Sequence, residues 1–240
     1  MAVASKRILG KKVRENLAKK ENEEFLLEKI KEEWRKIARA KKRKEIIDKT
    51  ADKGIVIGKL LLKLALIGGI LTIVMVAPGV AAVMAPGRRE WFYFDKKQLD
   101  RECARLTYRK FVIVTYDERS DIRKVESTKL GDRYIFWESF INYRTGQPAV
   151  WDGLYRIIFF DVPDELKSFR DAFRAQLMRA GYYWLQKSVL VFPYECTKDI
   201  LFFASIFGIL GYVCISETKN LRELGGCDRA REIRKFYHLD

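Results

Sequence analysis

One stretch of the chain, from Trp151 to Ser216, alternates between strand-like and helix-like patterns and constrains the fold more than any other feature. It opens with residues 154–162 (LYRIIFFDV), a nearly continuous apolar run that is typical of a strand buried on both faces. Pro163 then suits the first turn of a helix, and Gly181 stands where that helix needs a left-handed cap. The pattern predicts a strand that leads directly into a helix.

The second half of this stretch repeats the pattern with one strand more. Residues 182–192 (YYWLQKSVLVF) are typical of two short strands joined by a tight turn, residues 197–208 of a helix, and residues 211–216 of a last strand. The order strand, helix, strand, strand, helix, strand is that of the split βαβ, or ferredoxin-like, sandwich, in which both helices cover one face of the sheet. We therefore predict an α+β fold with a ferredoxin-like domain at residues 151–217.

Three blocks of this domain resemble the central domain of the PaaX family of transcriptional repressors: WDGLYRIIFFDVPDELKSFRDAF, GYYWLQKSVLVFPYEC and FFASIFGI. That domain is itself similar to CRISPR-associated protein 2, a small ferredoxin-fold nuclease, through the strand that ends in Asp161 and through residues 185–189 (LQKSV). The resemblance implies a transcriptional regulator, a repressor, that binds double-stranded DNA. It also implies that the ferredoxin-like domain joins two chains into a homodimer.

Asp161 is the one position for which the resemblance implies chemistry. In the nuclease family, an aspartate here from each subunit is proposed to hold a divalent metal between the two. A carboxylate at a strand end suits Mg²⁺, which typically takes one or two carboxylates and keeps water or phosphate as its other ligands. Acidic residues are also common at the start of helices. We expect a structural Asp161, and the alternative is a Mg²⁺-dependent nuclease of RNA or DNA with Asp161 as its catalytic and metal-binding residue.

The composition points to an anionic partner and excludes several kinds of site. The formal charge is +15, from 47 Lys or Arg against 32 Asp or Glu, which indicates binding to nucleic acid or to an acidic membrane surface. The four cysteines are far apart and form no C-x-x-C pair, and the only histidine is His238, so neither a zinc site nor histidine-based catalysis is expected. No phosphate-binding glycine motif occurs, so no cofactor is expected. This cysteine usage fits a cytoplasmic protein.

Residues 1–53 are dense in charge, with 18 Lys or Arg against 10 Asp or Glu. Leu26, Ile30 and Trp34 recur at helical spacing, which predicts a long amphipathic helix. We interpret this segment as a basic helical arm. A solvated helix and an arm that binds nucleic acid phosphates both fit this pattern.

Residues 64–85 carry no charge over 22 positions, and about 20 apolar residues suffice to cross a bilayer. Pro78 would break a spanning helix, and both flanks are basic, which disfavours a single span in either orientation. We therefore predict a buried helix of a small domain. A membrane-tethered basic protein that binds nucleic acid is the second alternative.

A helix from residue 96 to residue 109 is predicted next, capped by Asp95. One face of this helix is apolar and would pack into a core. Another face carries four cations at a spacing of four residues: Lys97, Arg101, Arg105 and Arg109. Like charges at this spacing repel one another. We therefore predict that phosphates of a nucleic acid neutralise them, and the alternative is a face that is merely solvated.

Residues 111–116 and 122–127 are typical of two strands joined by a charged tip. Helices followed by such a hairpin predict a winged helix-turn-helix over residues 54–136, with the last helix in the major groove. The segment between Pro78 and Asp95 is short for the second helix of that motif. The arrangement resembles the amino-terminal domain of PaaX-type repressors, and the predicted phosphate contacts of the wing are Arg119, Arg123 and Lys124.

Two connecting segments complete the predicted organisation. Residues 137–150 contain Gly146 and Pro148 and are interpreted as a linker between the two domains. Residues 218–240 are interpreted as a C-terminal tail with a short helix at residues 228–237.

Overall fold

The computed structural model describes residues 2–41, 53–84, 91–117 and 122–239. The chain forms two compact units. Residues 1–23 and 140–240 make up the four-stranded unit, and residues 24–139 make up the five-stranded unit. The fold is of the α+β class, as predicted, and every strand pair is antiparallel.

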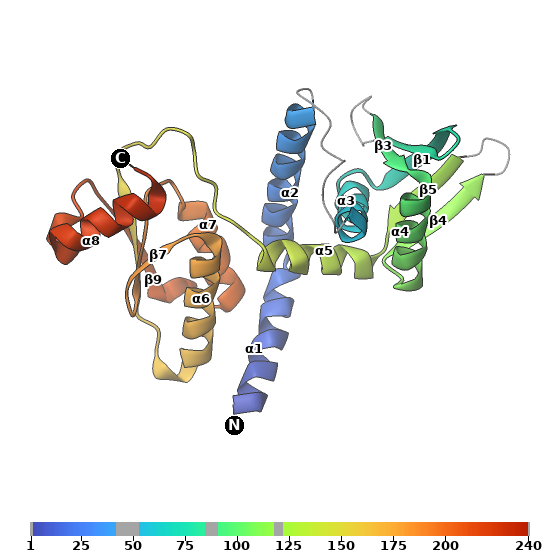
Figure 1. The fold of residues 1–240 in the computed structure, drawn as a ribbon. Coiled ribbons are helices and arrows are strands. Elements are labelled where there is room, and N and C mark those ends of the chain that lie inside the picture. The colour runs from blue at the N-terminus through green and yellow to red at the C-terminus, as the bar shows by residue number, and fades with distance from the viewer. Residues whose placement is uncertain (1, 42–52, 85–90, 118–121, 240) are drawn as a thin grey trace. The chain divides into compact units, whose positions relative to one another are not determined.

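The sheet of the four-stranded unit has the strand order β7-β8-β6-β9. Its elements follow the predicted order: β6 (Tyr155–Phe160), η1 (Asp164–Leu166), α6 (Lys167–Ala180), β7 (Tyr183–Gln186), β8 (Val189–Phe192), α7 (Thr197–Phe207), η2 (Leu210–Tyr212) and β9 (Val213–Thr218). Gly181 ends α6 with a φ of 109°, in the left-handed region that favours glycine. The split βαβ arrangement predicted from the sequence is therefore present, with α6 and α7 on one face of the sheet (Figure 1).

Two further helices complete the four-stranded unit. α1 (Ala2–Leu17) packs on α6 and α7, and its Asn16 side chain donates a buried hydrogen bond of 2.9 Å to the carbonyl oxygen of Ile206. α8 (Arg222–Tyr237) lies on the opposite side of the sheet from α6 and α7 (Figure 1). The buried Tyr237 hydroxyl accepts the N–H of Tyr183 at 2.8 Å and lies 2.9 Å from the carbonyl oxygen of Val191. The helix predicted in the C-terminal tail is thus present and is longer than predicted.

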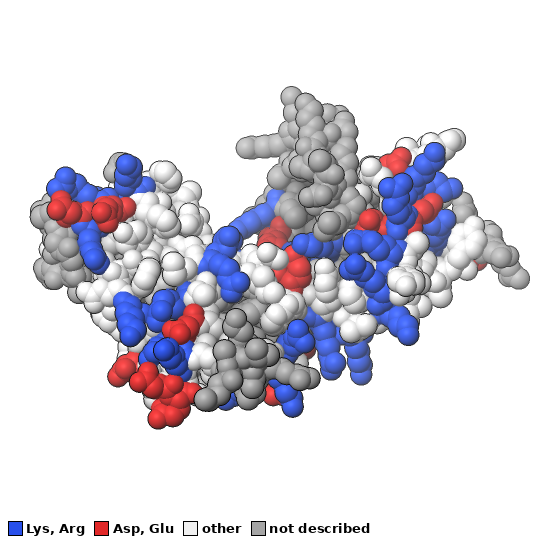
Figure 2. Space-filling model, turned by 60° about the horizontal axis from the view of Figure 1, so that its bottom comes forward, with Lys and Arg blue, Asp and Glu red and all other residues white. Residues whose placement is uncertain are grey.

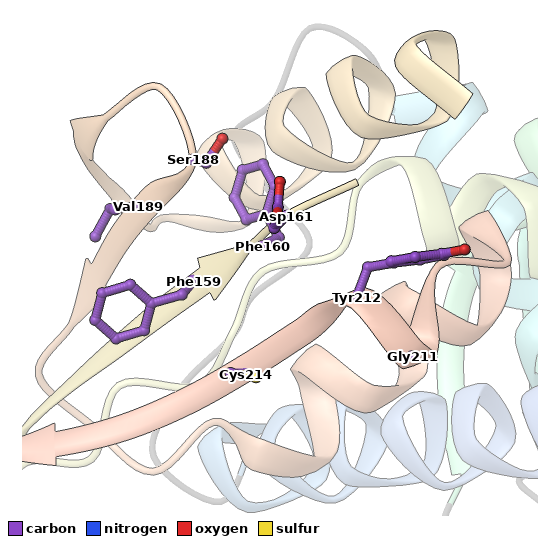
Figure 3. Close-up of a pocket in the computed structure, with 8 residues that line it drawn as sticks. All are labelled: Phe159, Phe160, Asp161, Ser188, Val189, Gly211, Tyr212 and Cys214. Atoms are coloured by element: carbon purple, nitrogen blue, oxygen red, sulfur yellow. The ribbon is translucent and has the colours of Figure 1, made fainter. Parts of the chain in front are cut away.

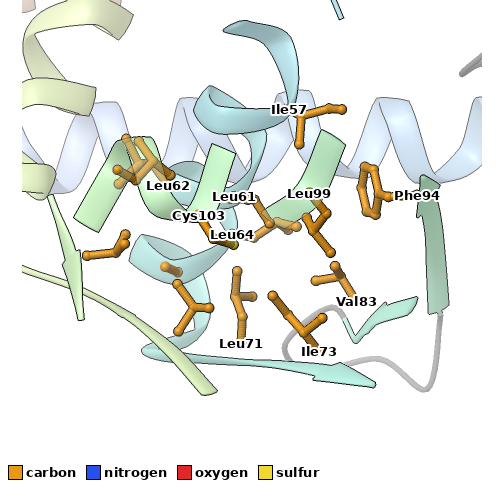
Figure 4. Packing of buried hydrophobic residues seen from close by; sticks show 14 of the residues in the cluster. Ile57, Leu61, Leu62, Leu64, Leu71, Ile73, Val83, Phe94, Leu99 and Cys103 are labelled. Carbon is orange, nitrogen blue, oxygen red and sulfur yellow. The ribbon is translucent and has the colours of Figure 1, made fainter. Parts of the chain in front are cut away.

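The five-stranded unit has the strand order β3-β2-β1-β5-β4. Its elements are most of α2 (Lys20–Lys41), then α3 (Lys53–Gly68), β1 (Ile70–Ala77), β2 (Val80–Met84), β3 (Trp91–Asp95), α4 (Lys96–Tyr108), β4 (Val112–Asp117), β5 (Ile122–Ser127) and most of α5 (Lys129–Ile141). Leu61 and Leu64 from α3, Leu99 from α4, and Leu71 and Ile73 from β1 meet in one apolar core (Figure 4). The alternation of β1 buries Leu71 and Ile73 while Thr72 and Val74 stay on the other face.

The predicted helix over residues 64–85 is wrong for most of its length. α3 ends at Gly68, and residues 70–84 form the β1–β2 hairpin, whose turn contains Gly79 at a φ of 81°. The run is rich in β-branched residues, which favour strands. In the part of the chain that the structure describes, no helix is long and apolar enough to cross a membrane.

The winged helix-turn-helix is not confirmed as such. The described residues between α3 and α4 form three strands and contain no helix, so the second helix of the predicted motif is absent from them. α4 and the β4–β5 hairpin are present where they were predicted. The unit thus keeps a helix followed by a wing-like hairpin, built on a five-stranded sheet.

Two segments that were predicted to be an arm and a linker contain helices with buried side chains in their described residues. The arm contains α1, which buries Val13 and Leu17, and α2, which buries Leu26, Ile30 and Trp34. α5 continues to Ile141, so the first part of the predicted linker is helical.

Candidate nucleic acid interface

α4 is positioned by a capped start and an apolar stripe, both as predicted. The Asp95 carboxylate accepts the backbone N–H of Gln98 at 2.9 Å, which satisfies one of the free donors at the start of the helix. Leu99, Cys103 and Leu106 are buried. Burial raises the pKa of the Cys103 thiol to about 11, so this cysteine is a structural, protonated side chain.

The four predicted cations of α4 are not equivalent. Lys97, Arg101 and Arg109 are exposed. Arg105 is only partly exposed, and its Nε donates to Oε2 of the buried Glu102 at 2.8 Å. Glu102 needs this partner because an unpaired buried carboxylate is costly. Arg105 therefore has a structural role, and three cations of the ladder remain displayed to solvent.

The wing residues are divided between the two faces of the sheet. Arg123 lies on the face covered by α4, where its guanidinium binds the carboxylate of Asp100. Lys124 is exposed, and because successive residues of a strand point to opposite faces, it lies on the other face of the sheet. Arg119 lies outside the described residues. The structure thus brings Arg123 to α4 and separates Lys124 from it.

Lys and Arg side chains gather over the part of the five-stranded unit that contains α4 (Figure 2). Tyr108, at the end of α4, is 89% exposed and adds an aromatic ring that was not among the predicted contacts. Its neighbour Lys110 is also exposed and adopts a φ of 58° where the chain turns from α4 into β4. Both residues stand in the sequence at the end of the helix that carries the cations, and this position could have identified them as candidate contacts. An exposed face of cations with an aromatic ring is suited to phosphates and sugars.

Asp161 lies in a different place, at the end of β6 in the four-stranded unit. Its backbone N–H donates to the carbonyl oxygen of Tyr212 at 3.0 Å, and its side chain is exposed. It lines an open pocket of about 420 Å³ (Figure 3), whose other lining residues are Phe159, Phe160, Ser188, Val189, Gly211, Tyr212 and Cys214.

The pocket supplies only part of a metal site. Asp161 is the one carboxylate among the residues that line it. Within the described ranges, no group of three or more His, Cys, Asp or Glu side chains is arranged to hold a metal ion. One carboxylate per chain is compatible with a Mg²⁺ ion shared between two subunits, so the catalytic and metal-binding role of Asp161 stays a prediction.

Comparison with protein families identifies the four-stranded unit. Residues 148–230 match the family model of the PaaX protein central Cas2-like domain. The match begins just before β6 and extends into α8. A search of curated proteins gives no match. The chain therefore contains a PaaX-type central domain, and the resemblance of residues 151–216 to that domain is confirmed.

Proposed function

We propose that this protein is a cytoplasmic, DNA-binding transcriptional regulator, a repressor, that acts as a homodimer joined through its Cas2-like domain. The observation that carries the proposal is the match of residues 148–230 to the central domain of PaaX proteins. A domain of this type in a regulator needs a DNA-binding part elsewhere in the chain, and the five-stranded unit is the candidate for that part.

The charge and shape of the five-stranded unit support this assignment. α4 presents Lys97, Arg101 and Arg109 to solvent on a helix whose opposite face is fixed in the core. The β4–β5 hairpin follows directly, in the order helix then wing that is typical of duplex-binding domains. A chain with a formal charge of +15 also gains affinity for duplex DNA by releasing counterions from the phosphates.

A gel-shift titration tests the proposal, with duplex DNA from upstream of the protein's own gene and an excess of scrambled duplex as competitor. We expect a discrete complex that survives the competitor, because a regulator distinguishes its operator from other DNA. A smear that the competitor abolishes would reduce the interaction to electrostatic attraction and would contradict the proposal.

The nuclease alternative rests on the exposed carboxylate of Asp161, which is one of the residues that line the pocket. The same titration, repeated with Mg²⁺, distinguishes it. Shortened DNA or RNA with the intact protein, and intact nucleic acid with Asp161→Asn, would favour a nuclease. Intact nucleic acid with both proteins would leave regulation as the function.

A further inference from the structure

The two edges of the four-stranded sheet differ in whether another element covers them. β7 forms one edge, and α8 caps it: the guanidinium of Arg229 donates to the carbonyl oxygen of Leu185, and the Tyr237 hydroxyl accepts the N–H of Tyr183. β9 forms the other edge, with β6 on one side and, among the described strands, none on the other. An open edge is a template for pairing with another strand.

The backbone groups that β9 offers can be identified. The Asp161 N–H donates to the Tyr212 carbonyl oxygen, which fixes the alternation of the β6–β9 ladder. The carbonyl of Tyr212 and the backbone groups of Cys214 and Ser216 therefore point toward β6. Val213, Ile215 and Glu217 direct their N–H and C=O groups outward.

Nothing in this part of β9 protects the edge. Natural edge strands are commonly guarded by lysine, proline or a bulge. Residues 213–216 (VCIS) contain neither residue, and their pairing with β6 is regular. We expect an unprotected edge strand of this kind to be covered in the functional protein.

An apolar surface extends from the β7–β8 turn across β6 to the start of β9. Phe159, Leu210 and Tyr212 are 36%, 51% and 41% exposed, and Cys214 is exposed in the same pocket as Phe159 and Tyr212 (Figure 3). No residue that lines the pocket is a Lys or an Arg. The patch is therefore a nearly uncharged area on a strongly basic chain.

The net charge of the chain indicates which partner can cover the edge of β9. Two copies that each carry +15 repel one another, so they can associate stably only where their contact surface lacks cations. Residues 213–217 (VCISE) contain no lysine or arginine, so the outer edge of β9 meets this condition, and an antiparallel edge is complementary to itself about a two-fold axis. Self-pairing of residues 213, 215 and 217 would form about six backbone hydrogen bonds.

We propose that β9 pairs antiparallel with β9 of a second copy of this chain, so that two four-stranded sheets become one continuous sheet. The apolar groups around Phe159 and Tyr212 then lie next to the same junction. This inference deepens the proposed homodimer by naming its contact surface, and it does not depend on whether the protein binds DNA.

The test uses proline at a position whose N–H points outward. Ile215→Pro removes that donor and leaves the β6–β9 ladder intact, because proline is tolerated on the free side of an edge strand. Ile215→Ala is the matched control, since it removes the side chain and keeps the N–H. Light scattering after size exclusion should give a dimer for the wild type and for Ile215→Ala, and half that mass for Ile215→Pro. A monomeric wild type, or a folded Ile215→Pro that stays dimeric, would overturn the inference.

Cross-linking keeps the test decisive if Ile215→Pro does not fold. Two symmetric registers place Cys214 opposite Cys214 or opposite Ser216 of the second copy. A short bis-maleimide should therefore link two wild-type chains, or two Ser216→Cys chains, and the link should disappear in Cys214→Ser. Absence of a linked dimer in both would refute the β9 pairing. A monomer that still gives a discrete gel-shift complex would refute it while leaving the regulator intact.

Discussion

Two glycines set how closely the helices of the five-stranded unit approach their neighbours. A Cβ on Gly58 of α3 would lie 2.6 Å from Nη2 of Arg105 and 2.7 Å from Oε2 of Glu102. A Cβ on Gly131 of α5 would overlap the carbonyl oxygen of Phe111. The spacing of α4 predicted that Arg105 would share a stripe with Arg101, but Arg105 pairs with the buried Glu102 next to Gly58, which is 47 positions away and gives no local signal.

Gly131→Ala should destabilise the protein by about 1–3 kcal/mol, because the backbone of Phe111 must move to admit the methyl group. The expected result is a lower urea midpoint, followed by tryptophan fluorescence. Gly10→Ala is the control, since no atom lies within 4 Å of its Cβ, and it should be neutral or stabilising by about 0.4–1 kcal/mol. Equal midpoints for both variants would contradict the close contact at Gly131.

A buried arginine predicts the acid response of the four-stranded unit. The Arg156 guanidinium, 5% exposed, binds the Asp152 carboxylate and holds the pKa of Asp152 below its usual 3.8. A carboxyl whose folded pKa is depressed contributes stability above its unfolded pKa and loses it as the pH falls through the folded value. The stability that this pair contributes is therefore complete above about pH 5 and is lost below 3.8.

Arg156→Met should make the stability of the protein less sensitive to acid. Urea midpoints measured between about pH 6 and pH 2 should fall less steeply with acid in the variant than in the wild type. Arg231→Met is the control, because Arg231 and its partner Asp228 are 78% and 89% exposed and such pairs contribute little. A variant with the wild-type slope would show that Arg156 does not set the acid response.

At the scale of elements, α4 is one of the helices whose sequence signals agreed with their structure. Its cap, its apolar stripe and the hairpin after it were all predicted, because each is a local pattern. The β1–β2 hairpin was missed because an uncharged run can be a buried helix or a pair of strands. Its β-branched residues and the Pro78-Gly79 turn were the signals for strands.

Asp95→Ala should cost about 1 kcal/mol, because the N–H of Gln98 loses its acceptor at the start of α4. Asp95→Asn should restore most of this stability, since asparagine is an equally good cap. Thermal unfolding of the three proteins checks the order. An unchanged Asp95→Ala would mean that the cap does not stabilise α4.

At the scale of the whole molecule, the chain combines a PaaX-type central domain with a second unit whose helix α4 displays a row of exposed cations. The strand order of the central domain followed from a pattern of alternating elements, whereas the exposure of each cation depended on tertiary contacts. Arg123 shows this, because its guanidinium binds the Asp100 carboxylate of α4, a contact that the spacing of residues does not reveal. The proposed function therefore depends on the cations that remain exposed.

The salt dependence of DNA affinity measures directly whether α4 contacts phosphates. Binding to operator DNA is measured by fluorescence anisotropy over a range of salt concentrations for the wild type, Lys97→Ala, Arg101→Ala and the control Arg231→Ala. Each phosphate contact contributes about 0.9 to the slope of log K against log salt, so the two α4 variants should bind more weakly and lose about that much slope. Arg231→Ala should match the wild type, because its side chain lies in the other unit. Wild-type affinity and slope in both α4 variants would contradict the assignment of α4 as the DNA-binding helix.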